Sequence, residues 1–139
     1  MDEFSAKKLG EVLAFCRVGQ EIIKKGKLFS EKMENLSSFE VQILDFVKKY
    51  NVSEITLPKS EKTSIKLLKM AEMYVGDEWD NPHEVMEWLG FFEGAAIIHW
   101  KLIEGVANKL NDTEFEIFTQ KNIQFHKEFL DEVGEKIKE

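Results

Sequence analysis

The sequence has few of the residues that break helices or cross-link chains. Only two of its 139 residues are proline and eight are glycine. Turn signals are therefore too sparse for a many-stranded sheet, and long helices are favoured. The single cysteine, Cys16, has no partner in the chain, which excludes an internal disulfide framework. There is also no Gly-rich phosphate loop, no Gly-x-Ser-x-Gly and no Cys-x-x-Cys motif.

Arginine is nearly absent, because the 19 basic residues are all lysine except Arg17. The formal net charge of −7 argues against nucleic-acid binding, which depends on basic side chains at phosphates. The acidity is concentrated in the second half. Residues 1–75 carry 13 basic and 11 acidic side chains, whereas residues 76–139 carry 6 and 15. The bias toward Lys and Glu is compatible with a thermophilic source.

Long hydrophobic runs are missing as well. The most apolar segment, Trp88 to Trp100, is broken by Glu93 and His99, so no membrane span is predicted. The first residues lack the basic and apolar regions of a secretory signal, and together with the lone cysteine this favours a cytoplasmic protein. With 43% hydrophobic and 32% charged residues, we expect residues 1–139 to form one globular domain.

Apolar spacing and capping signals predict the helices. Residues 3–26 form a first amphipathic helix, followed by a short helical piece at 31–36 and a helix over about 38–50, where Ser37 precedes Glu40 as in a capping box. Residues 51–58 are expected to be a loop or one isolated strand, because Pro58 disfavours a helical conformation in the preceding residue. A further helix over about 59–75 should end at Gly76.

The clearest helix start is at Asn81, where an N-cap, Pro82 and Glu84 coincide. A helix over 82–110 follows, and Asn111 with Glu114 repeats the cap spacing for a last helix. These two helices should form an antiparallel hairpin. The predicted fold is an all-α, up-and-down bundle of four to five helices, with this long hairpin at its centre.

The segment 82–110 is apolar on two sides. One side carries the regular core stripe, and the other carries apolar and small residues that would let a second helix approach closely. Either this helix is central in the bundle, or its second face is a homodimer interface. The candidate interface residues are Gly90, Phe91, Gly94, Ile97 and Ile98.

Three polar side chains fall on apolar helix faces. Asn122 and His126 lie within the core stripe of the last helix, and His99 lies among apolar residues of the preceding one. In an antiparallel hairpin centred near Asn111, His99 would come within about one turn of His126. Such a cluster could bind a small ligand or a metal, or shuttle a proton, with Glu93 the only further ligand nearby. The alternative is a hydrogen-bonded structural network.

Other patterns favour ordinary surface or core roles. No Glu stands three before a histidine, as di-iron bundles require, and the carboxylates of Glu84, Glu87, Glu128 and Asp131 face away from the apolar stripes. The stripe Lys59, Lys62, Lys66 and Lys69 is typical of a solvated face, and the three tryptophans are typical of packing.

No complete catalytic set, metal site or cofactor site is predicted. The sequence favours a non-catalytic interaction or scaffold protein that forms a homodimer. The alternative hypothesis is a ligand- or metal-binding bundle, conceivably enzymatic, that uses His99, Asn122 and His126.

Overall fold

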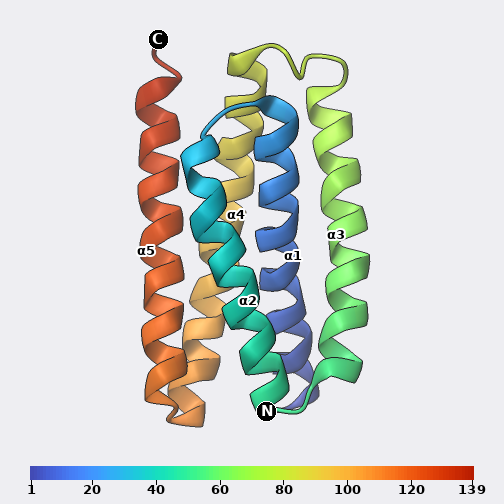
Figure 1. Ribbon diagram of the computed structural model, residues 1–139, viewed down its shortest axis with the longest axis vertical. Coiled ribbons are helices and arrows are strands. Elements are labelled where there is room, and N and C mark those ends of the chain that lie inside the picture. The colour runs from blue at the N-terminus through green and yellow to red at the C-terminus, as the bar shows by residue number, and fades with distance from the viewer. The chain divides into compact units, whose positions relative to one another are not determined.

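Every regular element in the computed structural model is helical, and the structure describes all of residues 1–139 (Figure 1). The predicted all-α bundle is confirmed, with five α-helices and no strand. No helix combines the length and the apolarity needed to cross a bilayer. The elements are α1 (Glu3–Gly26), the 3-10 turn η1 (Ser30–Lys32), α2 (Met33–Lys49), α3 (Ser53–Val75), α4 (Pro82–Leu110) and α5 (Thr113–Lys136).

The chain divides into two compact units, Met1–Met73 and Tyr74–Glu139. The first unit holds α1, α2 and most of α3, and the second holds the last two residues of α3 with α4 and α5. The single-domain organisation expected for residues 1–139 stays a prediction.

The first helix begins and ends with regular caps. The side chain of Asp2 accepts a hydrogen bond of 2.7 Å from the Ser5 backbone, and Lys27 takes the left-handed conformation that closes the last turn. Every residue from Leu9 to Cys16 is buried, so α1 is covered on all sides over this stretch. At Gly10, α3 comes so near that an added Cβ would lie 2.6 Å from the carbonyl oxygen of Thr56. Gly10 therefore permits the close approach of these two helices.

The helix over residues 33–49 differs from the sequence prediction. A break at Ser37 was expected, but α2 is continuous from Met33, and Ser37 is an exposed residue within it. Leu36, Phe39 and Ile43 form one buried stripe at helical spacing, so the helix packs as a single unit. The burial of this stripe outweighs the local capping signal at Ser37.

The expectation of a loop or strand over 51–58 is wrong. Helix α3 begins at Ser53 and contains Pro58 in its second turn. Val52 and Thr56 are both buried, and the Thr56 hydroxyl donates a 2.8 Å hydrogen bond to the carbonyl of Ala6. Proline removes one backbone donor, but the unpaired carbonyl is on exposed Glu54, where water can reach it. The predicted end is confirmed, because Gly76 follows the helix with φ of 62°.

The predicted hairpin of α4 and α5 is confirmed, and the two helices run side by side (Figure 1). The Asn81 side chain caps α4 by accepting a 3.1 Å hydrogen bond from the His83 backbone. The cap predicted at Asn111 is shifted by one residue. Asp112 caps α5 through the Phe115 backbone, and Asn111 ends α4 in the left-handed conformation.

Candidate functional site

The polar centre of the α4/α5 hairpin is a pair of buried side chains. Glu93 on α4 and His126 on α5 are each 2% exposed, and a 2.6 Å hydrogen bond joins Oε1 of Glu93 to Nδ1 of His126. Glu93 comes one heptad before buried Trp100, which places its carboxylate on a covered face of α4. A buried carboxylate needs such a partner, because an unpaired one costs several kcal/mol.

The residues of the predicted cluster have separate hydrogen-bond partners. His126 bonds to Glu93, and the amide nitrogen of buried Asn122 donates to the Phe118 carbonyl one turn earlier, at 3.0 Å. His99 is half-buried, and its Nδ1–H donates to the Ala95 carbonyl at 2.7 Å. Each of the three therefore has a partner within the second unit. The hypothesis that they bind a ligand stays a prediction.

The number of donor side chains around His126 determines whether a metal ion could be held there. No three His, Cys, Asp or Glu side chains come together as a set that could hold a metal ion. The Glu93–His126 pair supplies two donors, whereas a protein zinc site takes three or four. The arrangement is that of a satisfied polar pair in an apolar core.

The second candidate site is the outer face of α4. On this helix Phe91 is 63% exposed and Ile98 is 68% exposed, although their neighbours Leu89, Phe92 and Ala96 are buried. Gly94 lies between the two exposed residues on the same stripe. A Cβ added at Gly90 or Gly94 would meet nothing within 4 Å, so the backbone is open to an approaching partner at both positions. Ile97 is half-buried at the edge of this face.

Charged and aromatic groups flank this stripe. The ring of Tyr74 packs edge-on against Phe91 with 5.4 Å between centroids, and its hydroxyl lies 3.5 Å from the Glu87 carboxylate. Partial burial raises the pKa of Tyr74 above its usual 10.0, and the charges of Glu87 and Glu84 raise it further. Beyond Ile98, Lys101 is exposed and makes only a 3.9 Å contact with Glu104. The stripe is thus acidic at one end and basic at the other.

A polar cluster in the first unit was not found from the sequence. The Arg17 Nε of α1 donates to Oε2 of Glu40 on α2 at 2.9 Å, and the Gln20 amide donates to the other oxygen of Glu40 at 2.9 Å. The only local signal is that Arg17 is the sole arginine and stands three before Gln20. Nothing in the sequence shows that Glu40 faces both.

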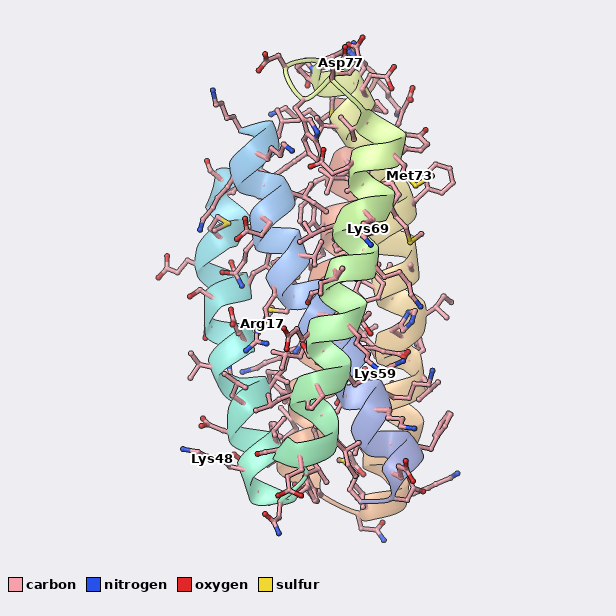
Figure 2. The ribbon with its side chains drawn as sticks, turned by 90° about the vertical axis from the view of Figure 1, so that its right-hand side faces the viewer. Arg17, Lys48, Lys59, Lys69, Met73 and Asp77 are labelled. Atoms are coloured by element: carbon pink, nitrogen blue, oxygen red, sulfur yellow. The ribbon has the colours of Figure 1, made fainter.

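The structure also locates two of the tryptophans, the cysteine and the lysines of α3. Trp88 and Trp100 are buried, as expected of packing residues, and Cys16 is buried with its thiol 3.0 Å from the Leu36 carbonyl. Lys62, Lys66 and Lys69 are exposed on α3, and Figure 2 shows Lys59 and Lys69 on this helix. These lysines form the solvated face that the sequence indicates.

No family model, no curated protein and no solved structure matches the chain.

Proposed function

We propose that this protein is a helix-face interaction module that forms a symmetric homodimer through the outer stripe of α4. Five residues define the α4 stripe: Glu87, Phe91, Gly94, Ile98 and Lys101. At 100° per residue they lie within about 80° of the helix circumference. The observation that supports the proposal is the exposure of Phe91 and Ile98 on either side of Gly94. Two large apolar side chains that flank an open backbone suit a second helix better than they suit water.

The charges along the α4 stripe favour an antiparallel arrangement. Glu87 and Lys101 each lie seven residues from Gly94, which is about 10.5 Å along the helix axis. If a two-fold axis passes by Gly94, Glu87 faces Lys101 of the partner subunit, and Phe91 faces the partner's Ile98. A parallel pair would instead place Glu87 beside its own copy. Opposite charges across the contact therefore fix the direction of the second helix.

Cellular location and source are further parts of the proposal. A single buried thiol and the absence of any disulfide suit a reducing compartment, and we place the protein in the cytoplasm on that basis. The excess of Lys and Glu supports a thermophilic origin. A scaffold role without catalysis agrees with the satisfied hydrogen bonds of Asn122, His99 and His126.

The experiment is a sedimentation-equilibrium measurement on the full chain and two matched variants. Ile98→Glu places a charge in the centre of the α4 stripe, and we expect it to be monomeric. Ile117→Glu makes the same change at a 56% exposed isoleucine on α5, and we expect it to remain dimeric. Both positions are exposed, so neither substitution should unfold the protein.

Two outcomes contradict the proposal. In the first, the unmodified chain remains monomeric up to millimolar concentration. In the second, Ile98→Glu and Ile117→Glu have the same effect on the association constant, which would show that the α4 stripe has no special part in dimer formation.

A further inference from the structure

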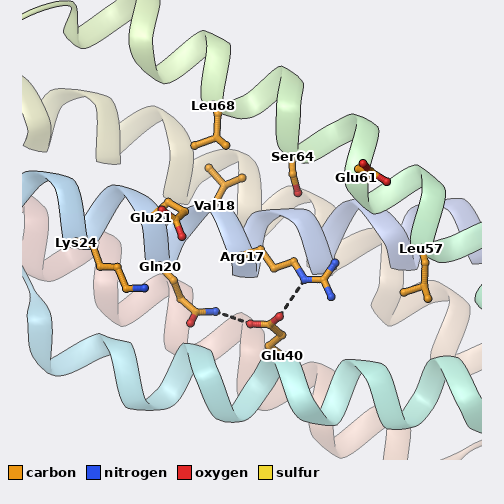
Figure 3. Close-up of a pocket in the computed structure, with 10 residues that line it drawn as sticks. All are labelled: Arg17, Val18, Gln20, Glu21, Lys24, Glu40, Leu57, Glu61, Ser64 and Leu68. Carbon is orange, nitrogen blue, oxygen red and sulfur yellow. Dashed lines mark hydrogen bonds and ion pairs between the residues drawn. The ribbon is translucent and has the colours of Figure 1, made fainter.

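A groove in the first unit shares no residue with the α4 stripe, so it is independent of the proposed dimer. It has a volume of about 610 Å³ and is bounded by α1, α2 and α3 (Figure 3). Its lining combines charged groups of both signs with the apolar side chains of Val18, Leu57 and Leu68. This mixture of polar anchors and apolar wall is typical of a small-molecule site.

The cationic anchor of the groove is held in place before any ligand binds. Glu40 accepts a hydrogen bond from Nε of Arg17 with one oxygen and from Gln20 with the other. The Gln20 amide is fixed in turn by the Cys16 carbonyl, at 3.2 Å. Figure 3 shows the Arg17 side chain extending from α1 with its guanidinium beyond the bond to Glu40. Its two terminal amino groups make no hydrogen bond in the chain, and they form the fork that binds a carboxylate in a bidentate manner.

A second donor in the groove lacks a partner. Ser64 on α3 lines the groove, and its hydroxyl oxygen is buried with no hydrogen bond. An unsatisfied buried hydroxyl is unfavourable, and rotation about one side-chain bond would let it bond to a ligand oxygen. Arg17 and Ser64 therefore offer donors from two different helices.

The charged side chains that line the groove determine which kind of ligand fits it. The lining contains two cationic side chains, Arg17 and Lys24, and three carboxylates, Glu21, Glu40 and Glu61, so it has one more negative than positive group. A phosphate with two charges would be repelled by these carboxylates. Glu61, three residues before Ser64 on α3, forms no salt bridge with another residue of the protein and can accept an ammonium group. A ligand with one carboxylate and one ammonium group satisfies both requirements.

From these observations we infer that the groove binds a small zwitterion of the aliphatic amino-acid class. Its carboxylate binds Arg17 and Ser64, its ammonium group binds Glu61, and its side chain packs on Val18 and Leu68. The ligand would bridge α1 and α3, so it stabilises the first unit by mass action. The ion pair between Arg17 and Glu40 keeps the anchor oriented in the free protein.

The test is a titration of the isotope-labelled full chain with three probes of the same shape, followed by NMR. The probes are L-leucine, 4-methylpentanoate, which lacks the ammonium group, and 3-methylbutylamine, which lacks the carboxylate. We expect leucine to shift the resonances of groove residues and to bind at least about tenfold more tightly than either analogue, since each lost charge-assisted bond costs about that factor.

Variants of the groove residues show which side chain binds which group of the ligand. Glu61→Gln should remove the advantage of leucine over 4-methylpentanoate, and Arg17→Gln should abolish binding of both. Because Arg17→Gln also removes the bond to Glu40, Ser64→Ala provides a test in which no intramolecular bond is lost. It should weaken leucine binding several-fold. Ser60→Ala is the matched control, because Ser60 is a buried hydroxyl of α3 that also lacks a partner but does not line the groove.

Three results overturn the inference. The first is that the groove resonances do not move at millimolar leucine. The second is that 4-methylpentanoate binds as tightly as leucine, and the third is that Ser64→Ala behaves like Ser60→Ala. The dimer proposal is unaffected by any of them, because the α4 stripe contains none of these residues.

Discussion

Oε1 of Glu93 lies 2.6 Å from Nδ1 of His126, and both side chains are withdrawn from solvent between α4 and α5. The bond spans 33 positions in the sequence and joins the two arms of the hairpin. It fixes which residues of α5 face which residues of α4, since any slip by one turn would leave a buried carboxylate and a buried imidazole unpaired.

Removal of one member of this pair should be more damaging than removal of both. We expect His126→Leu to lower the free energy of unfolding by about 3 to 5 kcal/mol, because it leaves the Glu93 carboxylate buried alone. The double variant Glu93→Leu/His126→Leu should recover most of that loss. Urea unfolding of the two single variants and the double variant measures the coupling. Additive losses would show that the two side chains act independently.

Gly94 should oppose stability and favour association. A Cβ at this position meets nothing in the chain, so Gly94→Ala should stabilise α4 by about 0.5 to 1 kcal/mol through its helix propensity. The same methyl group would separate two helices that meet at Gly94, and the dimer should weaken. Gly134→Ala on α5, also in open space, is the control. Because Gly134 lies in the last turn of α5, this substitution should give a smaller gain in stability, with an unchanged association constant.

Exchanging the charges of Glu87 and Lys101 tests the proposed antiparallel direction of the two α4 helices. Glu87→Lys and Lys101→Glu should each weaken the dimer, because each places like charges opposite one another across the two-fold axis. The double variant Glu87→Lys/Lys101→Glu should restore association to nearly the original constant. Sedimentation at low and high salt checks this, since the effect of each single variant should shrink as salt screens the charges. In a parallel dimer, Glu87→Lys would merely replace one like-charge pair by another.

Tyr74 should lose its phenolic proton above the usual pKa of 10.0, because partial burial and the nearby charges of Glu87 and Glu84 favour the neutral form. Phenolate absorbance in a Tyr50→Phe background measures this, and Glu87→Gln should move the midpoint back toward 10.0. The unfolded chain releases the proton first. Stability should therefore fall as pH rises from about 10 through the higher pKa of the folded state. A midpoint that Glu87→Gln does not move would show that this carboxylate does not act on Tyr74.

Some helix ends could be predicted from the sequence because their signals are local. Asn81 and Pro82 start α4 where expected, and Gly76 follows the end of α3. The region 51–58 could not be predicted, because the helix there depends on tertiary burial of Val52 and Thr56 against a proline that disfavours it. Ser37 failed as a cap for the same reason, since a buried stripe continues through it.

The positions of the polar residues could also be predicted only in part from the sequence. Periodicity places Asn122 and His126 on the buried face of α5, and both are buried. Periodicity does not show how far a side chain extends or which partner it contacts. The sequence indicates Glu93 only as a further ligand near the cluster, but its long side chain bonds to His126, whereas His99 turns back to its own helix. The contact of Arg17 and Gln20 with Glu40 depends on how α1 and α2 pack, which no local pattern encodes.

Disulfide trapping on α4 tests the two-fold contact most directly. In a Cys16→Ser background, Gly94→Cys should cross-link to its own copy on mild oxidation, because Gly94 lies at the proposed axis. Glu87→Cys alone should not cross-link, but it should form a mixed disulfide when combined with Lys101→Cys. Efficient self-linking of Glu87→Cys would indicate parallel helices, and failure of every pair would show that α4 is not the dimer interface.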